Sequence, residues 1–384
     1  MTEEDLQYYY PYRIDKDLNF RQYADKNNDF IRRYVPNYDG TNIYEFITRK
    51  SELSQKEIND FQYIYKTYSN WSDWYKYGKN MFSFSRELLQ MLERTDVSDI
   101  SPDNFHLPYD IFYLSLKPLN IKISEDRNEI IEGVYIDHNI WNHSGEHPEG
   151  YCDLSFHFVG DFKSIFDKYL PHVKSRLEYT DGKYEEYPLG SFWDVWLNFE
   201  KKEGRETVKQ AIDYFIEGLK EEIFPKNDTQ NLVTDYELDF FSSTLKLLDK
   251  TLNLVINCML YLSQPTDKKD IDLKLPKGLP SNYDKKLTFA KTTKESKKIE
   301  NKIESLGFTK IHFVGQSFKR SHIEISNNSN VQTHWRRGHW RNQKCGINLK
   351  DSKIIWILPT IVNNDKGEPL KGHIYNMDEK TTNR

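Results

Sequence analysis

The segment 331–347, VQTHWRRGHWRNQKCGI, concentrates side chains that can bind or cleave a phosphodiester. Guanidinium groups match phosphate oxygens with two parallel hydrogen bonds, and indole rings stack on unpaired bases. We predict that a nucleic acid or another partner is bound here by Arg336, Arg337, Trp340, Arg341 and Gln343, together with Lys319 and Arg320 upstream.

Two imidazoles in the same segment allow a second chemistry. Histidine titrates near neutral pH, so His334 and His339 are candidates for the base and the acid of a metal-independent RNA cleavage. An arginine would stabilise the transition state of that reaction. A binding site needs only the arginines and the rings, so the residues leave open whether the protein is an enzyme.

The geometry of the segment depends on one glycine. Val331 and Thr333 favour a strand, which Gly338 interrupts. Side chains alternate between the two faces of a strand, and a bulge at Gly338 adds one residue and reverses the later alternation. We therefore expect both tryptophans on a core face, with the other face carrying His334, Arg336, His339 and Arg341. The alternative is an edge strand with solvated arginines and two core tryptophans.

No pattern typical of a metal or cofactor site occurs in the sequence. The three cysteines, Cys152, Cys258 and Cys345, form no CxxC pair. P-loop, dinucleotide-binding and metalloprotease motifs are absent. One loop holds ligand-type residues, whose spacing matches no metal site: Asp137, His138, His143 and His147. We expect no metal and no cofactor.

Charge is distributed unevenly along the chain. Residues 265–350 contain 19 Lys and Arg against 8 Asp and Glu, although the 384-residue chain carries a net charge of −5. A basic segment on an acidic body suggests either a polyanion partner or docking against that body. No apolar run approaches the ~20 residues of a membrane span, and no leader precedes the first residues. We expect a cytoplasmic protein with no membrane partner.

Hydrophobic periodicity predicts the elements that position the segment. Three-four spacing predicts helices over 54–68, 71–92, 162–172, 192–199, 206–223, 236–262 and 293–306. Short apolar or alternating runs predict strands over 111–116, 121–124, 130–137, 151–159, 308–314, 353–358 and 360–362.

These elements predict an α+β protein, in which a mixed helical and sheet N-terminal body precedes a small sheet-rich C-terminal module. The expected divisions are a helical N-terminal region, an α/β body with a long core helix, a basic linker, and a basic β-rich C-terminal module, over 1–100, 101–263, 264–292 and 293–384.

The string HWRRGHWR at 334–341, with Gly346 and a strand containing Trp356 and Pro359 after it, resembles the C-terminal signature of a plasmid- and phage-borne family. This is the family of the type V-A anti-CRISPR protein that lowers the messenger RNA of the type V-A effector nuclease. Weaker similarity in the order of elements extends the resemblance over 65–365, and the first 60 residues match nothing in the family.

The resemblance implies a regulatory protein of a mobile element that acts on a target mRNA. RNA, or a translating ribosome with its nascent chain, would then be the partner, and no catalytic residue is assigned in the family. Two other functions stay open from the residues alone. One is a metal-independent ribonuclease or toxin-like enzyme that uses His334 and His339, and the other is a DNA-contacting replication or maintenance factor of a mobile element.

Overall fold

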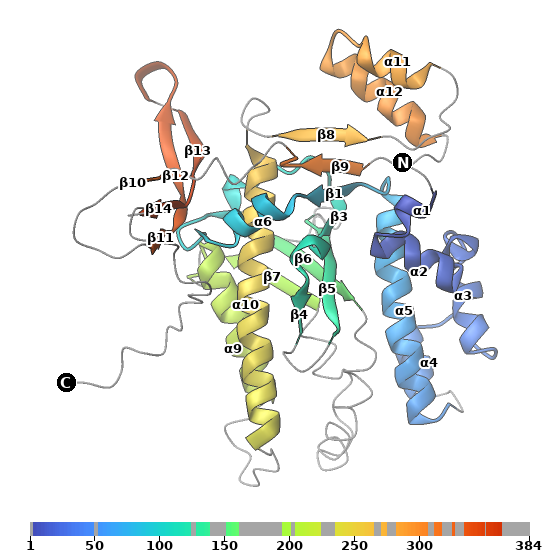
Figure 1. Cartoon of the computed structure of the whole chain (residues 1–384). Helices are drawn as coiled ribbons and strands as arrows, with labels where there is room; N and C mark the ends of the chain where they lie inside the picture. The colour runs from blue at the N-terminus through green and yellow to red at the C-terminus, as the bar shows by residue number, and fades with distance from the viewer. Residues whose placement is uncertain are drawn as a thin grey trace.

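The fold is α+β, with one large mixed sheet covered by helices on both faces (Figure 1). The computed structural model describes residues 3–49, 53–123, 128–138, 151–160, 194–200, 204–223, 235–264, 270–274, 282–305, 311–316, 325–326, 334–349 and 351–362. The strand order is β7-β6-β5-β3-β1-β9-β8, with β4 paired to β5. These strands are β1 Met81–Phe84, β3 Ile111–Ser115, β4 Ile121–Lys122, β5 Ile130–Asp137, β6 Tyr151–Gly160, β7 Asp194–Glu200, β8 Ile271–Lys274 and β9 Ile311–Val314.

The centre of the sheet joins distant parts of the chain. β1 runs parallel to both β3 and β9, and the other pairs of the sheet are antiparallel. The predicted divisions therefore need correction in two places. β8 lies in the expected linker, 264–292, and β9 lies in the expected C-terminal module, yet both complete the large sheet.

Helices of the first 76 residues cover one face of the sheet through a core rich in aromatic rings. In α5 the predicted capping box of Ser54 and Glu57 is confirmed, and the helix continues to Lys76. The rings of Phe30 and Tyr68 stack with centroids 3.8 Å apart. The helices are α1 Glu3–Leu6, α2 Tyr10–Leu18, η1 Phe20–Tyr23, α3 Asn27–Tyr34, α4 Ile43–Arg49 and α5 Gln55–Lys76.

The continuous helix predicted over 71–92 is wrong. Gly78 and Lys79 adopt positive φ angles of 100° and 54°, which end the first helix. β1 follows, and all four of its residues are buried. A central strand covered on both faces reads as an unbroken apolar run, so its period resembled that of the helices on either side.

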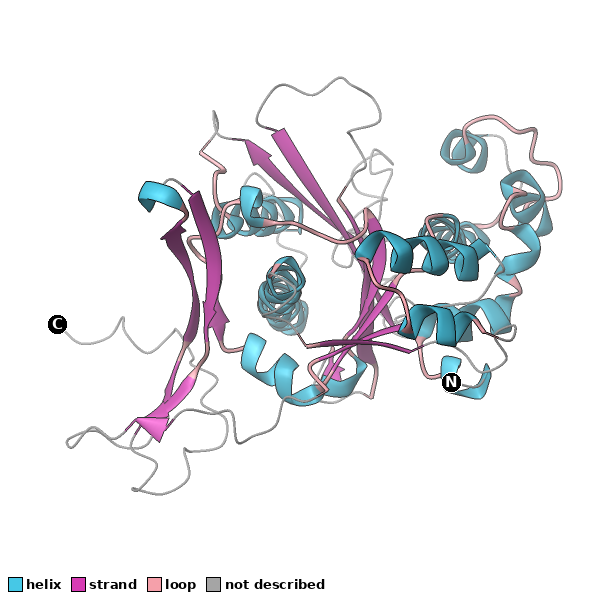
Figure 2. Cartoon of the chain, turned by 90° about the horizontal axis from the view of Figure 1, so that it is seen from above, coloured by secondary structure: helices cyan, strands magenta, loops and turns pink. Residues whose placement is uncertain are grey.

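On the opposite face, α10 lies between two sheets (Figure 2). Residues 254–262 of this helix are all buried, because the large sheet packs on one side and the C-terminal strands on the other. A helix that is apolar around its whole circumference is typical of such an enclosed position. The helices of this layer are α6 Arg86–Leu92, α9 Val208–Ile223 and α10 Asp235–Ser263; the predictions for α9 and α10 are confirmed.

The helix predicted over 192–199 is also wrong, because the segment forms the edge strand β7. Val195, Leu197 and Phe199 face the core, whereas Trp196 between them is 41% exposed. Alternation of this kind is the period of a strand. The helix predicted over 162–172 lies outside the described residues.

The remaining elements are short. α11 Tyr283–Thr288 and α12 Thr293–Ser305 form a helical pair beside β8, which confirms the helix predicted at 293–306. Among the helices that the structure describes, none combines the length and the apolar character of a membrane span. Three single turns, η2 Pro102–Asn104, η3 Lys117–Leu119 and η7 Ile347–Leu349, connect other elements.

Candidate binding face of the C-terminal hairpin

The HWRRGHWR string divides between two small sheets. β11 His334–Arg336 pairs with β14 Thr360–Val362, which also pairs with β10 Ile325–Ser326. β12 Gly338–Cys345 pairs with β13 Asp351–Ile357 and with β2 Thr95–Asp96. The predicted single strand with a bulge at Gly338 is therefore wrong, because the chain passes from one sheet to the other at Arg337.

Gly338 occupies a position with no room for a side chain. A Cβ atom there would lie 2.7 Å from Thr95 Oγ1, 2.8 Å from Pro359 Cδ and 3.0 Å from the Ile357 carbonyl oxygen. The Gly338 N–H also donates to the Arg94 carbonyl at 3.0 Å. The glycine thus lets β12 approach β2 closely enough to join it.

Trp340 anchors the hairpin to the central helix. Its indole is 8% exposed and stacks on Trp356, with centroids 6.0 Å apart. Trp340 Nε1 donates to Asn257 Oδ1 on α10 at 2.7 Å, while Trp356 Nε1 donates to Thr95 Oγ1 at 3.0 Å. Asn257 Nδ2 donates in turn to the Thr95 carbonyl at 2.9 Å, so the buried polar atoms of helix, β2 and hairpin satisfy one another.

The other face of β12 is exposed. His339 and Arg341 point away from the core, and Gln343 follows them at half-buried exposure. Arg341 Nη2 donates to Gln343 Oε1 at 2.6 Å. Directly opposed residues of an antiparallel pair share a face, so this surface also includes three residues of β13: Lys353, Ile355 and Ile357.

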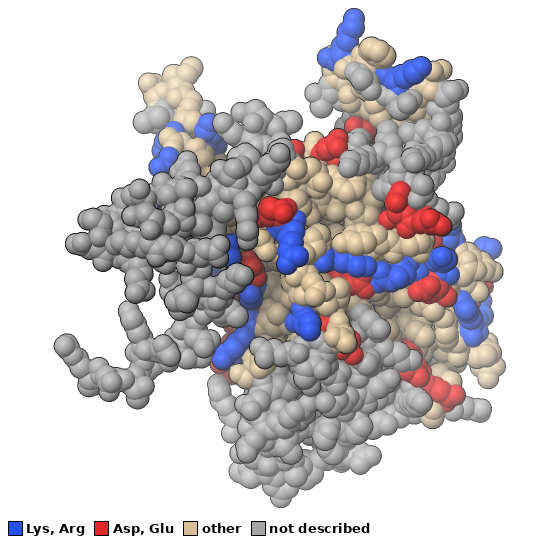
Figure 3. Space-filling model, viewed as in Figure 1, with Lys and Arg blue, Asp and Glu red and all other residues tan. Residues whose placement is uncertain are grey.

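Arg336 and Arg337 extend this surface. Both are exposed where the chain leaves β11 for β12. Lys344 and Lys353 are exposed on the hairpin as well, and Arg94 is exposed beside Gly338. We call the surface of His339, Gln343, Ile355, Ile357 and these five cations the basic face; Lys and Arg atoms gather on the described part of the hairpin at the upper left of Figure 3.

The structure brings together only part of the predicted site. Arg336, Arg337, His339, Arg341 and Gln343 lie on or beside one hairpin, as described above. Lys319 and Arg320 lie outside the described residues, and of His334 only the backbone in β11 is described. The prediction that Trp340 contacts a partner does not fit its burial, because neither ring face is open to a base.

The basic face has the chemistry of a binding surface. Guanidinium and ammonium groups supply donors for phosphate oxygens, and the two isoleucines supply apolar area between them. His339 is the single imidazole described on this face, and general acid–base cleavage of RNA would need a second proton-transferring group within reach.

A second polar cluster, which sequence reasoning missed, connects β6, β7 and α5. His157 Nδ1 donates to Asp194 Oδ1 at 2.5 Å, and Lys66 pairs with the other oxygen of Asp194. Burial alone would raise the pKa of Asp194, but the His157 hydrogen bond and the Lys66 charge outweigh it and hold the pKa below its usual value. The signal was the alternation in β7, which the helix prediction concealed.

The loop with Asp137 and His138 was also weighed as a metal site. Asp137 ends β5 and His138 follows it; His143 and His147 lie outside the described residues. Within the described ranges, no group of three or more His, Cys, Asp or Glu side chains is arranged to hold a metal ion.

Comparison with known proteins places this geometry in a family. Residues 82–364 match the model of the AcrVA2-like family, the anti-CRISPR type V subtype A2 family. A crystal structure of AcrVA2 is similar at 15% sequence identity and a TM-score of 0.40, covering 92% of this chain and 97% of that chain. None of the curated proteins matches the chain. Because the family model matches well over half of its length, this protein belongs to the anti-CRISPR type V subtype A2 family.

Proposed function

We propose that this anti-CRISPR family member binds single-stranded RNA of a target transcript through the basic face, and thereby lowers expression of the target. The transcript would be bound alone or while a ribosome translates it. The observation that carries the proposal is the exposure of Arg336, Arg337 and Arg341 around one rigidly anchored hairpin.

Anchoring supports the proposal because it fixes the cations without using them. The contacts that attach β12 to the body come from Gly338 and Trp340, on the side opposite Arg341. A surface whose charged side chains are not needed to hold its own fold is available for a partner. Arginine is suited to phosphate because its planar fork presents several donors at once.

Binding to labelled single-stranded RNA at several salt concentrations tests the proposal. We expect affinity to fall as salt rises, with the slope reduced by roughly 0.7 for each arginine–phosphate contact removed. Arg336→Ala and Arg341→Ala should each weaken binding and leave the melting temperature unchanged, because exposed side chains contribute little core area. Lys220→Ala, which removes an exposed cation from α9, serves as the matched control.

The same assay separates the alternatives. Incubation in EDTA with loss of cleavage in both His334→Ala and His339→Ala would identify a ribonuclease instead. A higher affinity for duplex DNA than for RNA at equal salt would favour the DNA-contacting function. Equal RNA binding by wild type and both arginine variants, or no binding at all, would contradict the proposal.

A further inference from the structure

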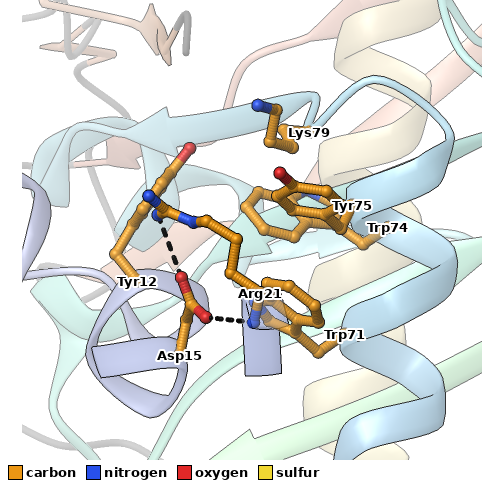
Figure 4. A pocket seen from close by; sticks show the side chains of 7 residues that line it. All are labelled: Tyr12, Asp15, Arg21, Trp71, Trp74, Tyr75 and Lys79. Carbon is orange, nitrogen blue, oxygen red and sulfur yellow. Dashed lines mark hydrogen bonds and ion pairs between the residues drawn. The ribbon is translucent and has the colours of Figure 1, made fainter. Parts of the chain in front are cut away.

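A pocket of about 220 Å³ opens between the N-terminal helices and α5 (Figure 4). Its walls come from α2, η1, α5 and the residue that follows the Gly78 turn. The lining side chains are Tyr12, Asp15, Arg21, Trp71, Trp74, Tyr75 and Lys79. The pocket precedes residue 82, where the family match begins, and lies on the opposite face of the large sheet from the basic face.

Both indoles of the pocket offer only apolar surface to a ligand. Trp71 Nε1 donates to the Pro11 carbonyl at 3.0 Å, and Trp74 Nε1 donates to the Asn80 carbonyl at 2.8 Å. The indole N–H is the single polar group of this side chain. Tyr75 stacks on Trp71, with centroids 4.7 Å apart, which extends the aromatic wall towards the opening.

The carboxylate of the pocket is already neutralised. Asp15 is buried; one oxygen accepts from the Arg21 backbone N–H at 2.7 Å and the other pairs with Arg21 Nη2 at 2.9 Å. A guanidinium group has five N–H donors, and the Arg21 side chain is 62% exposed. Donors of Arg21 therefore remain for a ligand after the ion pair has formed.

Lys79 brings a second cation to the same opening. Its left-handed backbone, at φ 54°, directs the ammonium group over the Tyr75 ring, 4.8 Å from the centroid. Figure 4 shows the Arg21 guanidinium, the Tyr12 hydroxyl and the Lys79 ammonium on the same side of the pocket, beyond the two indoles. Two cations and one carboxylate leave an excess of one positive charge.

We propose that this pocket binds a small organic monoanion that carries a single aromatic ring. The anionic group, a carboxylate or a phosphodiester, lies between Arg21 and Lys79, and the ring lies against the aromatic wall. The pocket is smaller than the 300–1,000 Å³ of most ligand sites, which limits the body to about one ring system. This site is separate from the basic face and does not depend on its function.

Ligand-observed NMR on the full-length protein tests the proposal with two anionic probes and their neutral counterparts. Benzoate represents an aromatic carboxylate and is compared with benzamide; the dinucleotide UpU represents a phosphodiester and is compared with uridine. We expect at least one anion to bind about tenfold more tightly than its neutral counterpart, because a charge-assisted hydrogen bond is lost with the charge. Which anion binds identifies the anionic group.

Variants then locate the binding. Lys79→Asn removes the ammonium group and keeps a residue that tolerates positive φ, so affinity should fall about tenfold. Lys76→Gln changes an exposed cation of α5 outside the lining and should bind like the wild type. Binding of neither anion, equal binding of the neutral probes, or unchanged affinity of Lys79→Asn would overturn the proposal; the first two comparisons need only wild-type protein.

Discussion

At the scale of single residues, Gly338 decides whether the basic face can be presented at all. The polar and aromatic neighbours of Gly338 are fixed by the hairpin register, and Thr95 and Pro359 approach it from two sides. Spacing in the sequence indicated that this glycine interrupts a strand. It did not reveal that the reason is contact with β2, because Thr95 lies more than 240 positions earlier.

Gly338→Ala should therefore destabilise the protein by about 1–3 kcal/mol, since three neighbours would have to move. Gly218→Ala is the matched control. Gly218 lies in α9 with open space around its Cβ position, and alanine should stabilise the helix by about 1 kcal/mol. Urea unfolding of both variants measures the difference, and a Gly338→Ala protein as stable as the wild type would contradict the packing described here.

Asp194 makes stability depend on acid. Its pKa is lower in the folded protein than in the unfolded chain, so its contribution is complete above the unfolded pKa and disappears as pH falls through the folded pKa. Asp194→Asn should lower the free energy of unfolding at pH 7 by about 3 kcal/mol, because His157 and Lys66 lose a buried partner.

The difference between wild type and Asp194→Asn should shrink as pH falls below about 4. Thermal unfolding over a pH series measures this convergence. Asp213→Asn, which changes an exposed carboxylate of α9, provides the control and should leave the pH profile nearly unchanged. A constant gap between wild type and Asp194→Asn down to pH 2 would show that the carboxylate charge is not responsible.

At the scale of elements, long and strongly periodic helices were predictable and short central strands were not. α9, α10 and α12 have enough turns for their apolar stripes to be read from the sequence. β1 and β7 have four and seven residues, and aromatic side chains beside them continue the helical spacing by chance. Tertiary pairing with β3, β6 and β9 decides their structure.

The orientation of the hairpin was predicted correctly, although its connection was not. Placing Trp340 on one face and His339 with Arg341 on the other required only the alternation of a strand, and this expectation is confirmed. The partner of Trp340, Asn257, lies in the middle of an apolar helix. Nothing in its local sequence distinguishes it from an ordinary polar interruption.

Asn257→Ala should loosen the hairpin from α10. Trp340 Nε1 and the Thr95 carbonyl would lose their partner, at a cost of about 1–3 kcal/mol. Hydrogen exchange in residues 338–345 should accelerate, while exchange in β3 and β5 should change less. Asn253→Ala is the control, because the side-chain bonds of Asn253 end one turn earlier in the same helix; equal acceleration in both variants would contradict the anchoring role.

At the scale of the whole molecule, the region before the family match is half of the core. Helices α2 and α5 cover the face of the large sheet that carries Met81, Ile111 and Tyr113, all of which are buried. The sequence suggested a separate helical region at 1–100 because its composition is polar and rich in tyrosine. Tyrosine rings supply the buried area here, which a count of aliphatic residues underestimates.

Deletion of residues 1–79 should leave a protein that aggregates or binds the dye ANS, since an apolar sheet face would be open to water. Size-exclusion chromatography and ANS fluorescence, with the full-length chain as reference, measure the outcome. A soluble, monomeric deletion variant with the melting temperature of the full chain would show that the matched region folds by itself.

The position of β9 beside β1 also governs when the protein can fold. Met81 pairs with Ile311, so the middle of the sheet requires a strand that the ribosome adds about 230 residues later. Closing so large a loop is slow and favours late formation of the native contacts. During synthesis the growing chain therefore exposes the edge of β1 until nearly the whole polypeptide has emerged, and chaperone binding should be concentrated in that interval.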